Sequence, residues 1–126
     1  MKVIVVGGGG REHSLAWKLA QSPEGEEIVC APGNAGTAAI GRNEPVGAED
    51  IEGLTALARR EGAGLVVVGP EVVLALGLAD RLEDEGIPVF GPGKAAARIE
   101  ASKAFSKELM EAAGIPTASF GVFDRP

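Results

Sequence analysis

Four consecutive glycines, at residues 7–10, constrain the fold of this chain more than any other stretch. They follow an apolar run without polar alternation at residues 2–6, which predicts a strand covered by helices on both faces. After the glycines, apolar residues recur at helical spacing from Leu15 to Ala20, and Trp17 is expected to pack against the protein. Four successive glycines are unfavourable inside a helix or strand, because each loses much backbone freedom on folding. We therefore predict a strand, a tight glycine turn and a helix.

A glycine turn that opens a helix presents bare backbone N–H groups at the positive end of the helix dipole. These groups suit an anion, above all a phosphate, so we expect Gly8, Gly9 and Gly10 to contact one. Arg11 either crosses that anion or stays solvated, and both interpretations remain open. A net charge of −6 over 126 residues argues against a general affinity for DNA or RNA. The phosphate is therefore expected to be captured locally, by the turn and Arg11.

Strand and helix patterns alternate along the rest of the chain. We predict strands at residues 27–31, 44–47, 65–68 and 87–90, with the proline-containing 44–47 at an edge of the sheet. We predict helices at residues 51–60, 74–85, 95–100 and 103–113, the first capped by Asp50 and the last by Ser102. Residues 32–37 are predicted to form a loop, and residues 117–123 to start a further strand. This rhythm predicts an α/β fold, an open parallel sheet flanked by helices on both faces.

Ligands of open parallel sheets bind at the carboxyl ends of the strands. This rule places two further loops beside the glycine turn, and their residues are Gly33, Asn34, Gly69, Pro70 and Glu71. Asn34 is expected either to stabilise its own turn or to touch a substrate. Glu71 is expected either to cap the next helix or to bind ribose hydroxyls.

Glu12 and His13 follow the glycine turn directly. Glu12 suits the first turn of a helix electrostatically, or else it hydrogen-bonds a ribose hydroxyl or an amine. His13 is the only histidine, and it is expected to be structural or to touch the substrate. Because no second histidine, cysteine or acid stands at ligand spacing, no metal site is expected. Cys30 is the only cysteine, which excludes a disulfide within the chain and favours a buried thiol in a reducing cytoplasm.

Other phosphate-binding classes fit the sequence less well. In a dinucleotide fingerprint, G-x-G-x-x-G, the third glycine would fall on Glu12 or His13, and no acid ends the second predicted strand. A Walker A turn would need a lysine and a hydroxyl residue after the glycines, and a response regulator would need an acid at the end of the first strand. The chain also opens without a secretory signal pattern, and no apolar run approaches a membrane span, so a cytoplasmic protein is expected.

Five stretches in order resemble the N-terminal part of the phosphoribosylamine–glycine ligases, also called glycinamide ribonucleotide synthetases. They are Val-Gly-Gly-Gly-Gly-Arg-Glu-His at 6–13, Ala-Pro-Gly-Asn-Ala-Gly-Thr at 31–37, Val-Gly-Pro-Glu at 68–71, Phe-Gly-Pro at 90–92 and Glu-Ala-Ser-Lys-Ala-Phe at 100–105. Together they cover essentially the whole chain. Val73 departs from the family, which commonly has proline there.

The resemblance implies an ATP-grasp ligase of purine biosynthesis. Such an enzyme joins glycine to 5-phosphoribosylamine, and ATP is cleaved to ADP and phosphate as it activates the glycine carboxylate. The resemblance assigns residues 1–101 to a Rossmann-like pre-ATP-grasp domain that holds phosphoribosylamine, and residues 102–126 to the start of the ATP-grasp region. ATP and Mg²⁺ (or Mn²⁺) are then expected to bind outside this chain, with no cofactor held tightly here. The chain is expected to be a fragment that packs on missing ATP-grasp domains and is inactive alone.

The expected substrate-binding residues combine the loop positions with this resemblance. They are Gly8, Gly9, Gly10, Arg11, Glu12, His13, Gly33, Asn34, Gly69, Pro70 and Glu71, with no catalytic residue and no metal ligand among them. Three alternatives remain open: the N-domain of another purine-pathway ATP-grasp enzyme, half of a dinucleotide-dependent oxidoreductase, and a non-catalytic phosphosugar-binding module. No nucleic-acid or membrane partner is expected for any of them.

Overall fold

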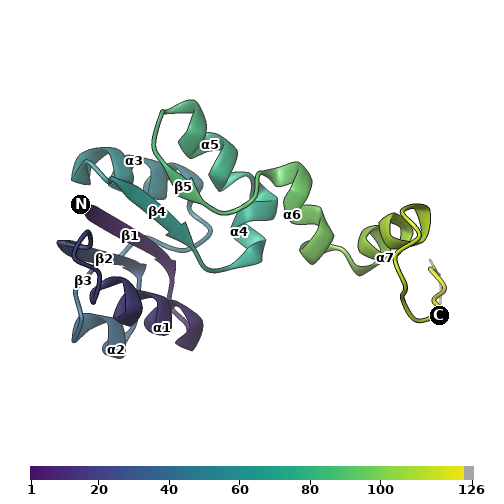
Figure 1. The fold of residues 1–126 in the computed structure, drawn as a ribbon. Coiled ribbons are helices and arrows are strands. Elements are labelled where there is room, and N and C mark those ends of the chain that lie inside the picture. The colour runs from purple at the N-terminus through teal and green to yellow at the C-terminus, as the bar shows by residue number, and fades with distance from the viewer. Residues whose placement is uncertain (124–126) are drawn as a thin grey trace.

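The computed structural model describes residues 1–123, which form a five-stranded parallel sheet flanked by helices (Figure 1). The strand order is β3-β2-β1-β4-β5, and every neighbouring pair is parallel. The strands are β1 (Lys2–Gly7), β2 (Glu27–Pro32), β3 (Arg42–Asn43), β4 (Leu65–Val68) and β5 (Val89–Phe90). This arrangement confirms the predicted α/β class and open parallel sheet.

Helices cover both faces of the sheet. They are α1 (Gly10–Leu19), α2 (Ala35–Ala38), α3 (Ile51–Glu61), α4 (Glu71–Leu76), α5 (Leu78–Asp84), α6 (Lys94–Ala101) and α7 (Lys103–Ala112). In Figure 1, α1 and α2 lie on one side of the sheet, and α3, α4 and α5 lie on the other. The last two helices, α6 and α7, lead away from the sheet, and no residue of α7 is buried.

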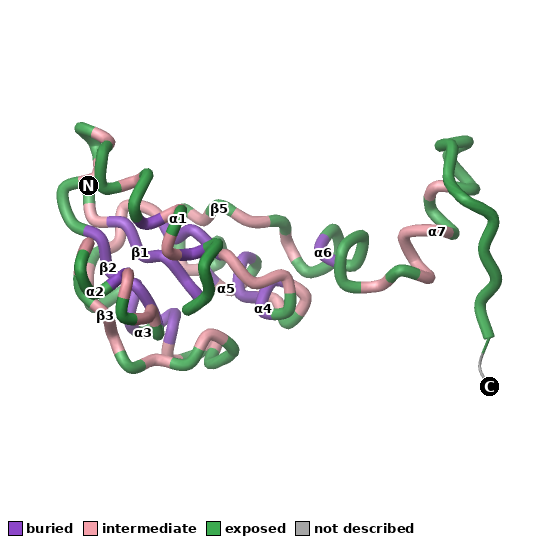
Figure 2. The backbone as a smooth tube through the Cα atoms, turned by 90° about the horizontal axis from the view of Figure 1, so that it is seen from below, coloured by how far each residue is buried: buried purple, intermediate pink, exposed green. Residues whose placement is uncertain are grey.

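The continuous apolar run of β1 is explained by its central position between two helical layers. Ile4 and Val6 belong to the core cluster shared with α3, α4 and α5. Val3 and Val5 point to the opposite face and belong to the cluster that includes Ala16 of α1. Successive side chains of a strand alternate between faces, so a strand buried on both sides needs an apolar residue at every position. Figure 2 shows buried residues along β1 and its neighbour β2.

Two of the predicted helix caps are present. The Asp50 carboxylate accepts the backbone N–H of Gly53 at 2.9 Å, and Gly62 ends α3 in a left-handed conformation with φ 59°. Ser102 caps α7, because its hydroxyl accepts the N–H of Phe105 at 3.3 Å. These local signals explain why α3 and α7 begin where the sequence predicts.

Three predicted elements were wrong in type or in position: the loop at residues 32–37, the strand at residues 44–47 and the helix at residues 74–85. Residues 32–37 are not only a loop, because Asn34 caps a helical turn that begins at Ala35. The edge strand is β3 rather than residues 44–47, and it ends just before the proline-containing segment. The helix predicted at 74–85 begins at Glu71 and is divided at Gly77, whose φ of 105° does not continue an α-helix.

Two further expectations also failed. Residues 117–123 form no strand in the described part of the chain, where they run beside α7 rather than along a sheet edge. Trp17 is 58% exposed on α1 rather than packed inside. Its neighbour Ala16 is buried instead, because only one face of this surface helix packs against the sheet and Trp17 lies on another face.

Candidate functional site

The three loops grouped by the sequence leave the sheet at the same edge. β1 is central, and its residue Val6 pairs with both Ala31 of β2 and Val68 of β4. The N–H of Gly33 donates to the carbonyl oxygen of Gly7 at 3.1 Å, and the N–H of Gly69 donates to that of Val6 at the same distance. Since β2 and β3 lie on one side of β1 and β4 and β5 on the other, the topological switch point lies at these loops.

The glycine turn is open to solvent. Gly8, Gly9 and Gly10 are all exposed, and Gly9 is the N-cap of α1. Gly7, which is buried at the end of β1, has a φ of 121° that a side chain would strain. The first N–H groups of a helix have no partner within it, so the turn offers hydrogen-bond donors to an anion at this edge.

The Glu12 side chain lies beneath the turn rather than outside it. It is only 3% exposed, and its carboxylate accepts the N–H of Gly9 and the Nε–H of Arg11, each at 2.7 Å. A Cβ on Gly7 would lie 2.6 Å from Glu12 Cγ, and a Cβ on Gly69 would collide with the carboxylate. Burial works against ionisation, but the hydrogen bonds from Arg11 and Gly9 hold the pKa of Glu12 below its ordinary value.

Arg11 follows the glycine turn directly, and its side chain connects this turn to the loop after β4. Its side chain is half exposed, with Nε bonded to Glu12 and Nη1 3.6 Å from a carboxylate oxygen of Glu71. Glu71 is the first residue of α4 and follows Pro70, the N-cap of that helix. The hydrogen bond to Glu12 raises the pKa of the Arg11 guanidinium further, so its positive charge is permanent.

Asn34 joins the loop after β2 to the glycine turn. Its side-chain oxygen accepts the N–H groups of Gly36 and Thr37 at 2.8 and 3.0 Å, which caps α2. Its side-chain amide donates to the carbonyl oxygen of Gly8 at 2.9 Å. Both ends of Asn34 are therefore engaged within the protein, where they fix the turn.

Thr37 and Asn43 belong to this site although the sequence did not single them out as site residues. Thr37 is fully buried and donates its hydroxyl to Asn43 Oδ1 at 2.8 Å. Asn43 in turn donates to the backbone oxygen of Asn34, also at 2.8 Å. A Cβ on Gly33 would collide with the Asn43 side chain. Thr37 is detectable as the third residue after a helix N-cap, whereas nothing in the sequence around Asn43 signals its role.

His13 packs its ring against Gly36, so it joins α1 to α2. A Cβ on Gly36 would collide with the imidazole. The two helices can therefore approach closely only because residue 36 has no side chain. This contact matches the structural alternative for His13. Among residues 1–123, no group of three acidic, histidine or cysteine side chains could hold a metal ion.

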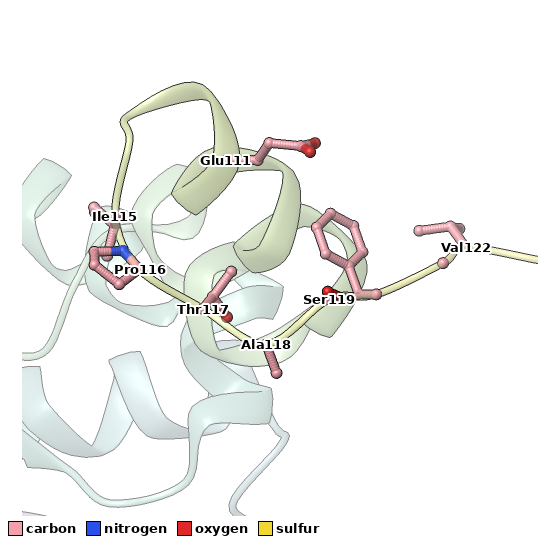
Figure 3. Close-up of a pocket in the computed structure, with 9 residues that line it drawn as sticks. Glu111, Ile115, Pro116, Thr117, Ala118, Ser119 and Val122 are labelled. Carbon is pink, nitrogen blue, oxygen red and sulfur yellow. The ribbon is translucent and has the colours of Figure 1, made fainter.

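A separate hollow lies at the other end of the molecule. Figure 3 shows it between α7 and the segment that follows, with Glu111, Ile115, Pro116 and Thr117 among its lining residues. None of the predicted site residues lines it. In the described chain, no helix is both long and apolar enough to cross a membrane.

The chain matches a described protein family over most of its length. The family is "Phosphoribosylglycinamide synthetase, N domain", and the match covers residues 1–100. A phosphoribosylamine–glycine ligase of Nostoc sp. is 57% identical over 125 residues, and one of Allochromatium vinosum is 54% identical over 125 residues. Each alignment covers 98% of this chain, and the chain spans 29% of the length of these curated relatives.

Solved structures agree with this match. The phosphoribosylamine–glycine ligase of Thermotoga maritima has a TM-score of 0.68 and 34% identity, covering 94% of this chain and 26% of that one. The N5-carboxyaminoimidazole ribonucleotide synthetase of Thermus thermophilus has the same TM-score with 28% identity, covering 92% of this chain and 31% of that one. These findings confirm the resemblance drawn from the five sequence stretches. The chain belongs to the family of phosphoribosylglycinamide synthetase N domains.

Proposed function

We propose that this chain is the substrate-binding N-terminal part of an ATP-dependent ligase of purine biosynthesis. The whole enzyme joins glycine to 5-phosphoribosylamine, and this part holds the phosphoribosylamine. The names of the relatives support the reaction, and the family match supports the assignment of the chain to the N-terminal domain. Such an enzyme works in the cytoplasm, with small molecules as its substrates.

The observation that carries the proposal is the exposed glycine turn with Arg11 beside it. Gly8 and Gly10 offer backbone donors at the start of α1, whereas the N–H of Gly9 is bonded to Glu12, and Arg11 adds a permanent positive charge. Within a chain of net charge −6, these groups supply a local attraction for a phosphoryl group. Glu71 faces Arg11 from the next loop, where its half-exposed carboxylate can accept hydrogen bonds from sugar hydroxyls.

The predicted site residues divide into two groups in this proposal. Residues that are exposed or half-buried, with groups left for a ligand, bind it in this proposal: Gly8, Gly10, Arg11, Pro70 and Glu71. Residues whose polar groups or rings are engaged inside the protein shape the site: Gly9, Glu12, His13, Gly33, Asn34 and Gly69.

We place the nucleotide and metal chemistry outside this chain. The family match over residues 1–100 supports a substrate domain at residues 1–101, and we propose that residues 102–126 begin the ATP-grasp region. The remaining domains would bind ATP and Mg²⁺ and complete the ligase.

Titration with ribose 5-phosphate tests the phosphate site directly. We expect this chain to bind ribose 5-phosphate weakly and ribose not at all, as measured by calorimetry or by NMR shifts of the glycine-turn amides. Arg11→Gln should weaken the binding about tenfold or more, because hydrogen bonds to charged groups contribute roughly 1.5–3 kcal/mol. Arg59→Gln makes the same change in charge on α3 and should leave the affinity unaltered.

Two results would contradict the proposal. One is a wild-type chain that binds ribose and ribose 5-phosphate equally, or neither of them. The other is tighter binding of NAD than of ribose 5-phosphate, which would favour the dinucleotide-dependent alternative. N5-carboxyaminoimidazole ribonucleotide, the compound in the name of the Thermus thermophilus synthetase, belongs in the same titration, because that synthetase is as similar in fold as the Thermotoga maritima ligase.

A further inference from the structure

Glu12 is the one carboxylate buried at the carboxyl edge of the sheet in the part of the chain that the structure describes. A buried charge is costly unless it is paired and hydrogen-bonded. Both carboxylate oxygens are engaged: one accepts the N–H of Gly9 and the other the Nε–H of Arg11. The side chain also fills the space over Gly7 and Gly69, where no Cβ could be accommodated.

This burial separates Glu12 from any ligand above the turn. A carboxylate that is 3% exposed, with one oxygen on Gly9 and the other on Arg11, has little capacity left for a ribose hydroxyl. Its effect on the site must therefore pass through the groups that it holds. Of these, Arg11 is the one that is both charged and open to solvent.

Arg11 would otherwise be free to adopt many orientations. Its side chain is 53% exposed, and a long exposed arginine side chain has many accessible rotamers. The 2.7 Å bond from Nε to the buried Glu12 carboxylate fixes one edge of the guanidinium. Nη1 lies 3.6 Å from Glu71, a looser contact that a ligand can replace. The guanidinium is thus held between the Glu12 and Glu71 carboxylates, next to the turn, before any ligand arrives.

We propose that Glu12 is a positioning residue of the phosphate site, which acts by holding the Arg11 guanidinium next to the glycine turn. This inference rests on the proposed function, because it concerns the same phosphoryl group. Glu12 contributes affinity without touching the ligand, since Arg11 needs no further ordering when the ligand binds. The contribution of Glu12 therefore depends on Arg11 being present.

A double-mutant cycle between Glu12 and Arg11 tests this dependence. Affinity for ribose 5-phosphate is measured for this chain as wild type, Glu12→Gln, Arg11→Gln and the double variant. We expect Glu12→Gln to weaken binding about tenfold in the wild-type background. In the Arg11→Gln background, the same change should alter the affinity less than about twofold. Glu83→Gln on α5 removes the same charge from an exposed position and should change nothing.

A spectroscopic measurement separates positioning from general support of the fold. In the ligand-free wild type, we expect a resolved Arg11 Nε–H signal in the ¹⁵N-correlated NMR spectrum, because its proton is bonded to a buried carboxylate. Glu12→Ala leaves no acceptor for this proton and should remove the signal, while the strand amides keep their shifts. If Glu12→Ala does not fold, the wild-type signal is the test: its presence supports the inference, and its absence overturns it.

The outcomes for the two proposals differ. A wild type that does not bind ribose 5-phosphate overturns the proposed function, and the positioning role falls with it. A wild type that binds, together with a Glu12→Gln variant that binds equally well, overturns the positioning role alone. Equal losses from Glu12→Gln with and without Arg11 would also overturn it, since the two residues would then act independently.

Discussion

At the scale of single residues, the carboxyl edge depends on the absence of side chains as much as on their presence. Gly7 and Gly69 lie against the Glu12 carboxyl group, Gly33 against Asn43, and Gly36 against His13. Each glycine leaves room for a polar side chain that then holds a loop in place. The abundance of glycine near the strand ends is therefore a packing requirement as well as a means of making turns.

Gly69→Ala is the sharpest test of this packing. Its Cβ would collide with the Glu12 carboxylate, so either the carboxylate or the loop after β4 must move. We expect the free energy of unfolding to fall by about 1–3 kcal/mol, which is typical of overpacking a well-filled site. Chemical denaturation measures it. The matched control is Gly10→Ala, where a Cβ meets nothing within 4 Å, and its stability should be unchanged or slightly higher. Equal stability of the two variants would contradict this account.

At the scale of helices and strands, the elements that the sequence predicted best are those set by local signals, although the local cap of α2 at Asn34 was missed. The apolar runs of β1 and β4 and the caps of α3 and α7 depend on residues close in sequence, and these elements were placed within a few residues. The position of the edge strand was wrong because it depends on pairing with residues distant in sequence. β3 lies where Val29 and Cys30 offer a pairing edge, and Asn43 is held there by Asn34.

The candidate site shows the same division. The three loops were correctly predicted to lie at one edge, because they follow parallel strands, and the run of glycines correctly indicated an exposed turn. The sequence could not reveal that Glu12 points inward, because its direction depends on the space left by Gly69 of another loop. Nor could it reveal Asn43, whose role exists only once β2 and β3 are paired.

The opposite edge of the sheet is joined by an ionic cluster, which predicts a pH dependence of stability. Glu61 at the end of α3 pairs with Lys2 of β1 at 2.7 Å and with Arg42 of β3 at 2.8 Å. Hydrogen bonds from Lys2 and Arg42 lower the pKa of Glu61 to about 2. Because this pKa lies below the ordinary value of 4.5, the ionised carboxylate stabilises the fold above pH 4.5, and the contribution is lost as the pH falls toward 2.

Glu61→Gln should therefore be less stable than the wild type at neutral pH, with a smaller loss of stability between pH 4.5 and 2. Urea denaturation across this range measures both quantities. Glu83→Gln is the control, because Glu83 lies on α5 and forms no ion pair with Lys2 or Arg42. If the wild type and Glu61→Gln lose stability in parallel on acidification, the cluster does not act as described.

At the scale of the whole molecule, the chain consists of a packed sheet layer and a projecting helical end. The family match stops at residue 100, close to the junction of α6 and α7 at Ser102. The two helices are joined there by Arg98, whose guanidinium lies 4.0 Å from the centroid of the Phe105 ring. Since α7 has no buried residue, we expect this contact to contribute to its orientation.

Removing that contact should loosen α7 without affecting the sheet. In Arg98→Gln, we expect faster amide hydrogen exchange across α7 and unchanged exchange in β1 and β4, because a cation–π contact at an exposed site contributes about 0.5–1 kcal/mol. Exchange followed by mass spectrometry gives the comparison, with Arg59→Gln as the charge-matched control. Unaltered exchange in α7 would show that other contacts orient this helix.

The inward carboxylate of Glu12 has a consequence for how recognition starts. The positive ends of the backbone N–H dipoles and a neighbouring guanidinium repel one another unless a negative charge lies close to them. Here the polypeptide carries its own counter-ion, bonded to Gly9 and Arg11. Because Glu12 holds Gly9 and Arg11 in place, the protein itself fixes the arrangement of these groups, and an incoming phosphoryl group does not have to order them.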